Sequence, residues 1–547
     1  MIISRVREKI EVFFKKPITA MVLFNIFCPI IFMFVCEPHF ASTDDQFLNQ
    51  IFAGTFGKPE AGYGKVNFVL GHFLKTLYEL LPGIPWFALI QCVCVFVSFM
   101  TITCIIIKTT ERWGGTITCI IFLILCGYEC YARISYIKTS VVCVMTSCYI
   151  FYRLMTYRMK SNKLLVMGVV LFFVGFMWWD KSLIVSLVVL GIPMLLRMIK
   201  ERKDKNFRFV LGMACLIVVG TGILSLGNKC YIKSNQEVEQ YTNYISTWAK
   251  INNYGWPDFY ENIDVFDDLE ITESEYNLLV AGEGGVGDPI SLEELQKIEE
   301  ITEKPEINLS KILDFTRKYP IHFFEIGIFL GFLIICFLFS LSTTKNKVFW
   351  GSYLFIVSYG LFFWYFMNNI DEVMVRGVII WIAPIIAMLA IMEDIHVDSI
   401  GLQRYYSFII GIALVILINQ QYWNITSKYQ GDTYEIQEMI DIISADAENI
   451  YLTNNEDFIQ KDMPFDSLQK GAYQSCNIMK LPYTIYNSNS NMENIEDNIG
   501  KVRFLSIDYA ERVATYMSEK YLRNYYVGEA DVIGDSFIYQ VIENTDL

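Results

Sequence analysis

The chain alternates between long apolar blocks and shorter polar segments. The blocks are about 18 to 22 residues long, and an α-helix of that length, rising about 1.5 Å per residue, crosses about 30 Å of hydrocarbon. Strands buried in a soluble protein would be far shorter. The pattern therefore predicts an α-helical polytopic membrane protein with about 11 transmembrane helices. The predicted spans are residues 18–36, 86–107, 114–131, 139–156, 164–179, 182–198, 209–227, 321–341, 348–367, 373–392 and 406–424.

Basic residues gather in alternate loops between these spans. They are Lys108, Arg112, Arg153, Arg158, Lys160, Lys163, Arg197, Lys200, Arg202, Lys203, Lys205, Arg208, Lys345 and Lys347. The positive-inside rule makes these loops cytoplasmic, together with the basic N-terminus, which we interpret as the flank of an uncleaved anchor. An odd number of spans then leaves the C-terminus outside. Trp86, Trp178, Trp179 and Trp423 fall at predicted outer ends of spans, as an aromatic belt requires.

This topology divides the chain into two regions. Residues 1–424 form a transmembrane domain with extracytoplasmic loops 37–85 and 228–320, and residues 425–547 form an extracytoplasmic α/β domain. Apolar periodicity in the first loop predicts helices that lie along the membrane surface. The other outer elements predicted from periodicity are helices around 234–250, 291–317, 434–444 and 508–524, and strands at 449–453, 502–507 and within 525–541.

The composition supports a membrane protein and narrows its partners. Apolar residues make up 54% of the chain and charged residues 19%, and the mean hydropathy is +0.36. The net charge of −14 arises because acidic residues concentrate in segments 228–320 and 425–547. Acidic outer segments without a basic stripe argue against nucleic-acid binding. Most of the 14 cysteines lie inside apolar spans, so we expect no disulfide framework.

The candidate catalytic residues are Asp44 and Asp45, directly after the first predicted span on the outer side. Two adjacent carboxylates repel each other, which raises one pKa and makes a general base near the bilayer. A structural alternative stays open. Ser42 followed three residues later by Asp45 resembles a capping box, with Asp in place of Glu, at the start of a surface helix.

The candidate phosphate-binding residues are cations predicted to converge on the same outer surface: Arg133, Lys138, Lys181 and Arg376. A charged side chain at membrane depth is costly, by about 2.5–3.5 kcal/mol on insertion scales, and so requires a partner or a polar cavity. Several cations around one site would bind a phosphate or pyrophosphate head group. Alternatively, each cation extends to the interface or pairs with a neighbouring acid.

Two other sequence patterns do not indicate a binding site. The run Gly282–Gly287 matches a dinucleotide fingerprint, but no strand precedes it and it lies on the outer side, so we interpret it as a loop. His39 and His72 share the first outer loop with the acidic pair. Their spacing matches no helical metal motif, so we expect no metal site there.

The order of these features resembles the C superfamily of glycosyltransferases (GT-C), polytopic enzymes that use polyprenyl-phosphate sugars as donors. A basic N-terminus, one span and an outer loop with an acidic pair and amphipathic helices come first, followed by many spans and a small outer domain. Four segments look like a group of bacterial multi-span membrane proteins presumed to be of this type. They are Asp44–Asp45, residues 133–139, residues 273–298 and the strand at 449–453.

The resemblance implies an inverting transfer in a bacterial plasma membrane. Asp44 or Asp45 would deprotonate a hydroxyl of a cell-envelope glycan, lipid or protein acceptor, which then attacks the anomeric carbon of a polyprenyl-phosphate sugar. Arg133, Lys138 and Arg376 would stabilise the departing phosphate. No cofactor is expected, because fixed cations can take the role of a metal ion.

Two rival functions remain. A polymerase or ligase for lipid-linked polysaccharide would place its key groups in loop 228–320, which is rich in acids and contains few cations that would hold phosphate. A transporter or flippase would carry charges at mid-span and a twofold repetition of its spans. Most charges here lie at span ends instead.

Overall fold

The computed structural model describes most of the N-terminal half of the chain and part of the C-terminal domain. The described residues are 17–36, 38–54, 59–62, 64–109, 112–157, 161–191, 194, 205–281, 290–303, 382–383, 385–387, 389–390, 446, 449–452, 478–479, 499–533 and 536–544. Three predicted spans, 321–341, 348–367 and 406–424, lie outside them, as does the helix predicted near 434–444. Of span 373–392, the structure describes residues 382–383, 385–387 and 389–390.

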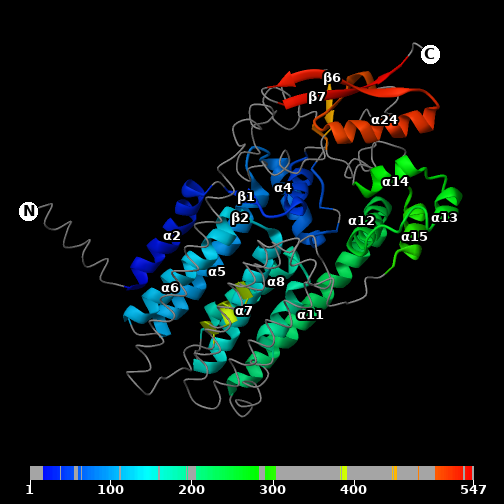
Figure 1. The fold of residues 1–547 in the computed structure, drawn as a ribbon. Helices are drawn as coiled ribbons and strands as arrows, with labels where there is room; N and C mark the ends of the chain where they lie inside the picture. The colour runs from blue at the N-terminus through cyan, green and yellow to red at the C-terminus, as the bar shows by residue number, and fades with distance from the viewer. Residues whose placement is uncertain are drawn as a thin grey trace, which may run out of the picture.

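Helices occur in every predicted span before residue 230, and Figure 1 shows them side by side in a bundle. They are α2 (Pro17–Val35), α5 (Trp86–Thr109), α6 (Arg112–Gly127), α7 (Tyr136–Tyr157), α8 (Asn162–Trp178), α9 (Ser182–Ser186) with the π-helical turn η2 (Leu187–Gly191), and α11 (Lys205–Ser234). A second π-helical turn, η1 (Tyr128–Ala132), follows α6 directly. The predicted span 209–227 lies within α11, which begins at Lys205 and continues through Asn228 and Lys229 to Ser234.

Two of the described helices are long and apolar enough to cross a membrane. They are Trp86–Lys108 in α5, with a mean hydropathy of 2.5, and Leu211–Ser234 in α11, with 1.8. The apolar stretches Met21–Val35, Thr118–Ala132, Asn162–Trp178 and Ser182–Gly191 are shorter. The described residues thus confirm a mostly helical chain with two candidate spans, and the larger number of about 11 stays a prediction.

Helices α7 and α8 pack closely because small residues face each other at two levels. The Ser140 hydroxyl donates to the carbonyl oxygen of Gly175 at 2.6 Å, and the Ser147 hydroxyl donates to that of Gly168 at 2.6 Å. Small residues let helix backbones approach, and hydroxyl groups then bond across the interface. This pair fixes the position of α7, whose N-terminus helps to form the candidate site.

We expect Gly175→Ala to destabilise the protein by about 1–3 kcal/mol, as overpacking of a tight core usually does. A Cβ at this position would lie 2.7 Å from Val144 Cγ2 and 2.8 Å from the Ser140 carbonyl oxygen, which is backbone and cannot rotate away. The melting temperature of the detergent-purified protein measures the effect. Gly212→Ala is the matched control, because no atom lies within 4 Å of its added Cβ. Equal melting temperatures for the two variants would contradict the prediction.

Segment 37–85, predicted as the first outer loop, contains the two helices predicted from its periodicity. They are α3 (Thr43–Ala53) and α4 (Phe68–Leu80), and a short strand, β1 (His39–Phe40), precedes them. Helix α4 buries Leu74 against the bundle while its other face exposes Phe73. A helix with apolar residues on both faces suits a position along a membrane surface.

The segment after α11 folds into four helices around one apolar core. They are α12 (Gln236–Tyr254), α13 (Ile263–Asp268), α14 (Glu273–Val280) and α15 (Leu292–Ile301). Trp248, Phe266 and Leu295 lie in this core. At its other end, α12 stacks Tyr241 on Phe47 of α3, with ring centroids 6.3 Å apart. The predicted helices at 234–250 and 291–317 correspond to α12 and α15, and residues 304–317 lie outside the described residues.

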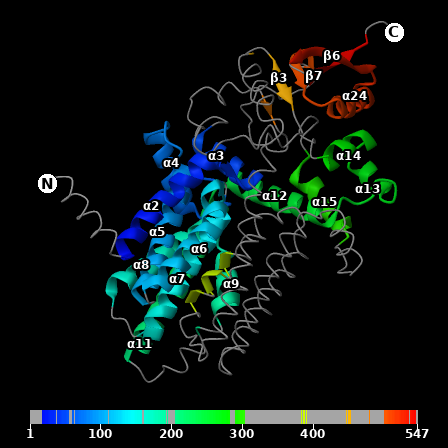
Figure 2. The same ribbon diagram turned by 60° about the vertical axis from the view of Figure 1, so that its left-hand side comes forward.

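The C-terminal domain contains a mixed sheet in the order β4-β3-β5-β7-β6. Its strands are β3 (Ile450–Leu452), β4 (Ile478–Met479), β5 (Val502–Phe504), β6 (Tyr525–Ile533) and β7 (Ser536–Glu543). β3 is parallel to β4 and β5, and β7 is antiparallel to β5 and β6. Helix α24 (Ile507–Tyr521) packs on this sheet, as Figure 2 shows.

The four-helix segment and the C-terminal domain contact each other directly. Leu278 of α14 belongs to the apolar core that α24 and the sheet form. The Ser274 hydroxyl, also on α14, donates to the carboxylate of Glu519 on α24. Figure 1 shows α14 beside α24 accordingly. Loop 228–320 and the tail, predicted as separate outer parts, are therefore joined through their described residues.

Candidate functional site

Asp45 joins the start of α3 to the start of α7. The Ser42 hydroxyl accepts from the Asp45 backbone N–H at 3.2 Å and donates to Oδ2 of the Asp45 carboxylate at 2.6 Å. Oδ1 accepts from the Tyr136 backbone N–H, the first amide of α7, at 2.7 Å. The first bond confirms Ser42 as a side-chain cap of α3, whereas the Asp45 carboxylate accepts from the Ser42 hydroxyl and not, as in a capping box, from the Ser42 backbone N–H. Together the bonds place one carboxylate at two helix N-termini, whose dipoles favour negative charge.

The Asp45 side chain is completely buried, and this burial dominates its protonation. Burial raises the pKa of Asp45 to about 7, and the nearby Asp44 charge adds slightly to the increase. The hydrogen bonds from the Ser42 hydroxyl and the Tyr136 amide stabilise the carboxylate and lower the pKa, but by less than burial raises it. Near neutral pH, Asp45 therefore exists in both protonation states.

Stability should fall as pH rises from about 4 to about 7 because of this residue. The folded protein binds the Asp45 proton up to about pH 7, whereas an unfolded chain releases it near pH 3.8. The folded state holds more protons between these values, so its stability declines by up to about 1.4 kcal/mol per pH unit. Unfolding of the detergent-purified protein from pH 4 to 8 measures the slope, which Asp45→Asn should reduce. Asp258→Asn, an exposed control, should retain the slope, and an unchanged slope in Asp45→Asn would contradict this assignment.

Asp44 occupies a different environment from Asp45. Its side chain is 19% exposed, and its Oδ1 lies 2.5 Å from the ammonium nitrogen of Lys65, which is 20% exposed. In the part of the chain that the structure describes, Oδ2 has no hydrogen-bond partner. Asp44 is thus the member of the acidic pair that solvent reaches. Lys65 was not identified from the sequence, because nothing local connects it to an acid twenty-one positions earlier.

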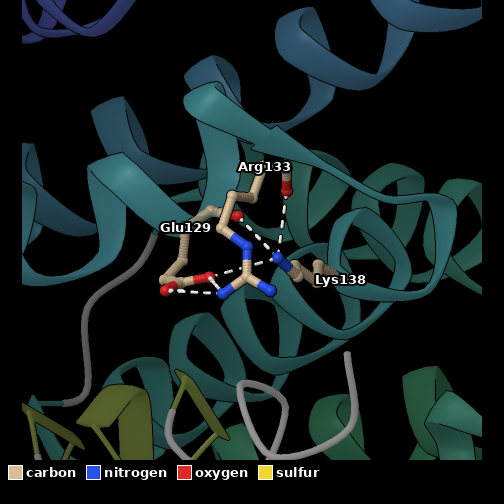
Figure 3. A network of polar contacts seen from close by, with 3 residues as sticks. All are labelled: Glu129, Arg133 and Lys138. Atoms are coloured by element: carbon tan, nitrogen blue, oxygen red, sulfur yellow. Dashed lines mark hydrogen bonds and ion pairs between the residues drawn. The ribbon is translucent and has the colours of Figure 1, made fainter. Parts of the chain in front are cut away.

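A buried ionic network lies in the segment that connects α6 to α7, shown in Figure 3. The guanidinium of Arg133 contacts both carboxylate oxygens of Glu129 at 3.3 Å. The ammonium of Lys138 donates to a Glu129 carboxylate oxygen at 3.2 Å and to the carbonyl oxygens of Glu129 and Arg133 at 3.1 and 3.0 Å. All three residues are buried.

This network fixes the backbone between α6 and α7. An ammonium group has three donors, and Lys138 directs each one to an acceptor inside the network. Its geometry therefore favours a structural role over contact with a ligand. Glu129 was missed by the sequence analysis. A lone acid inside the predicted span 114–131 was the available signal, because a charge at that depth requires a partner.

Strand pairing brings the acidic pair and this network to one region. β1 pairs in parallel with β2 (Arg133–Ile134), so that His39 aligns with Arg133. The Ala41 backbone N–H also donates to the Ile134 carbonyl oxygen at 2.8 Å. Segments 39–45 and 129–138 therefore lie side by side.

Of the other two predicted cations, the structure describes Lys181 alone. Lys181 lies immediately before α9, and its side chain is exposed. Arg376 lies outside the described residues. The phosphate-binding roles of Arg133, Lys138, Lys181 and Arg376 stay predictions.

The structure corrects the predicted position of one basic residue. Arg153, assigned to a cytoplasmic loop, is buried inside α7. Its guanidinium lies 5.1 Å from the ring centroid of Tyr149 and donates to the Leu389 carbonyl oxygen at 3.3 Å. A cation over an aromatic ring explains how α7 accommodates this charge.

The candidate site thus combines an accessible carboxylate at Asp44, a buried carboxylate at Asp45 and two buried cations at Arg133 and Lys138. Among the described residues, no group of three or more His, Cys, Asp and Glu side chains is arranged to hold a metal ion. His72 instead packs edge-on against the ring of Tyr231 at 5.2 Å. No protein-family model and no curated protein matches this chain.

Proposed function

We propose that the protein is a multi-pass membrane glycosyltransferase of the inverting GT-C type. It moves a sugar from a polyprenyl-phosphate donor to a cell-envelope glycan, lipid or protein acceptor on the outer face of a bacterial plasma membrane. The observation that carries the proposal is the acidic pair at the start of α3, a few residues after α2, bonded through Asp45 to the start of α7. The Arg133 network lies in the adjoining segment.

The two aspartates take different roles in this proposal. Asp44 is the base, because solvent reaches it and only its Oδ1 is engaged, by Lys65. Asp45 is a positioning residue, because both of its carboxylate oxygens already accept hydrogen bonds from Ser42 and Tyr136. A base needs an open position within hydrogen-bond reach of the proton it removes. Asp45 holds the first turn of α3 against α7 and so orients Asp44.

The reaction proceeds as one displacement. Asp44 accepts the proton of the acceptor hydroxyl, whose oxygen forms a new bond to the anomeric carbon of the donor sugar. The bond from that carbon to the phosphate oxygen breaks with both electrons, so configuration inverts and the polyprenyl phosphate leaves. Negative charge accumulates on the departing phosphate, and fixed cations such as Arg133 and Arg376 stabilise it. Lys138 binds no ligand in this proposal. Its ammonium group donates to the Arg133 carbonyl oxygen and so holds Arg133 in place.

The membrane-embedded part comprises the bundle that contains α5 and α11, the two helices of spanning length and hydropathy. In this proposal the N-terminus is cytoplasmic and the C-terminal domain extracytoplasmic, as the distribution of basic loops predicts. The acidic pair then faces the outer leaflet, where a polyprenyl-phosphate sugar presents its head group.

Transfer assays test the proposal. The full-length protein, purified and reconstituted in vesicles, is incubated with a panel of polyprenyl-phosphate sugars labelled in the sugar and with cell-envelope acceptors. We expect the label to move to an acceptor with release of polyprenyl phosphate. Movement of the intact labelled lipid between leaflets without transfer would indicate a flippase. Joining of lipid-linked oligosaccharides without use of a monosaccharide donor would indicate a polymerase or ligase.

A further inference from the structure

Aromatic side chains gather at the surface where α12 ends. Beyond Tyr254, the chain turns at Gly255, which has a φ of +97°, and presents Trp256 and Tyr260. Tyr260 is 66% exposed and Tyr254 is 37% exposed, whereas Trp256 is half-buried. We name the surface formed by Trp256 and Tyr260, whose rings are connected through Tyr276 and Phe259, the aromatic platform.

Buried aromatic rings support the platform from below. Trp256 packs edge-on against Trp248 of α12, with ring centroids 5.2 Å apart, and Tyr260 packs edge-on against Phe259 at 5.6 Å. Tyr276 of α14 lies between them, 6.3 Å from Trp256 and 5.4 Å from Phe259. The platform thus rests on the apolar core of the four-helix segment rather than on a flexible stem.

Two side-chain hydrogen bonds hold the exposed rings in place. The Trp256 indole N–H donates to the amide oxygen of Asn252 at 2.7 Å. The Tyr260 hydroxyl donates to a carboxylate oxygen of Glu273 at 2.5 Å. Both bonds lie at the surface, where water would otherwise satisfy the same groups. Rings fixed before binding lose little conformational entropy when a ligand packs on them.

The charge around the platform restricts its ligand. Lys250 and Lys297 are the only basic residues between positions 236 and 303, a segment that contains many acids. Asp258, Glu261 and Glu273 are the acids nearest to the platform in sequence or by hydrogen bonding. An anionic ligand would be repelled, whereas a ligand rich in hydroxyl or amine donors would find carboxylate acceptors beside the rings.

We propose that the aromatic platform binds a non-anionic glycan chain. The C–H faces of pyranose rings are apolar and pack on aromatic faces, while their hydroxyls donate to flanking carboxylates and amides. This chemistry matches exposed aromatic rings surrounded by acceptors, and it does not match a lipid surface, which would require basic or continuous apolar residues. The proposal rests on the proposed transferase and identifies its acceptor as a glycan chain.

The position of the platform on α12 connects it with the candidate site. Tyr241, near the start of α12, stacks on Phe47 of α3, the helix that carries Asp44. From Tyr241 to Tyr254 the helix rises roughly 20 Å. Figure 1 shows α12 extending from the bundle toward α13 and α14. A glycan chain that reaches from the platform along α12 brings one end toward the acidic pair.

Binding measurements on the full-length protein in detergent test the proposal. Oligomers of chitin, cellulose and chitosan are titrated against the protein by calorimetry, with oligogalacturonate as the anionic probe. We expect at least one non-anionic oligomer to bind and oligogalacturonate not to bind. Tyr260→Ala should weaken binding by about tenfold, since it removes one stacking ring. Tyr526→Ala, at an exposed tyrosine on β6, is the matched control and should leave binding unchanged.

Several results would overturn the platform. The first is that no non-anionic oligomer binds, and the second is that wild type and Tyr260→Ala bind the oligomers equally. The third is that Tyr260→Ala loses self-association while it still binds glycan. An unchanged melting temperature shows that Tyr260→Ala folds. Asp44→Asn should bind the oligomers as wild type does. Glycan binding without any transfer by wild type would refute the proposed transferase while leaving the platform intact.

Discussion

We expect Asp44→Asn to slow sugar transfer by about 100- to 10,000-fold, the range over which a positioned general base accelerates proton removal. The amide is close in size to the carboxylate and still accepts from Lys65, so the fold should be retained. It cannot accept the proton of the attacking hydroxyl. Initial rates with saturating donor, together with the melting temperature, measure the effect.

Asp45→Asn separates the base from the positioning residue. Its amide oxygen still accepts from the Tyr136 backbone N–H, so part of the connection between α3 and α7 persists. We expect a smaller loss of rate than for Asp44→Asn. Asp531→Asn, at an exposed acid on β6, should transfer sugar at the wild-type rate. Full transfer by Asp44→Asn together with inactivity of Asp45→Asn would reverse the assigned roles.

The second large effect concerns stability. Glu129→Gln should destabilise the protein by about 3–5 kcal/mol, because removing one member of a buried ionic group leaves the opposite charges without the partner that offset their desolvation. Both Arg133 and Lys138 contact the Glu129 carboxylate. The melting temperature and the denaturant midpoint in detergent measure the change.

An exposed ion pair provides the control for Glu129. On the four-helix segment, the ammonium nitrogen of Lys250 lies 2.6 Å from a carboxylate oxygen of Glu299, but water reaches both side chains. Solvent screens such a pair, so Glu299→Gln should change stability by less than about 1 kcal/mol. Similar, small changes in Glu129→Gln and Glu299→Gln would show that the buried network does not hold the α6–α7 connection.

Sequence reasoning located elements whose signals are local. The apolar block at 86–107 corresponds to α5 (Trp86–Thr109), and the alternating pattern within 525–541 corresponds to β6 and β7. The predicted helix near 508–524 ends at Tyr521, because Leu522 takes a left-handed conformation with a φ of 52°. β4 contains only Ile478 and Met479, too short for any periodicity to reveal.

Interactions between distant residues could not be predicted in this way. The spacing of three between Ser42 and Asp45 predicts a side-chain cap, and the structure confirms the bond from the Asp45 backbone N–H to the Ser42 hydroxyl. The bond from Tyr136 to Asp45 depends on how α3 meets α7, which no local pattern encodes. Arg153 was assigned to a loop because positive charge usually marks a span end. Its contact with Leu389 is a property of the folded bundle.

The bond between Asp45 and Tyr136 also sets an order for maturation during synthesis. Residues 39–45 leave the ribosome well before 133–136, since the chain is made from its N-terminus. Until the later segment has been translated, the Asp45 carboxylate lacks the Tyr136 amide and β1 lacks its partner strand. The acidic pair therefore acquires its final arrangement only after α5 and α6 have been synthesised. A nascent chain that stops before residue 133 carries both aspartates without the geometry that distinguishes them.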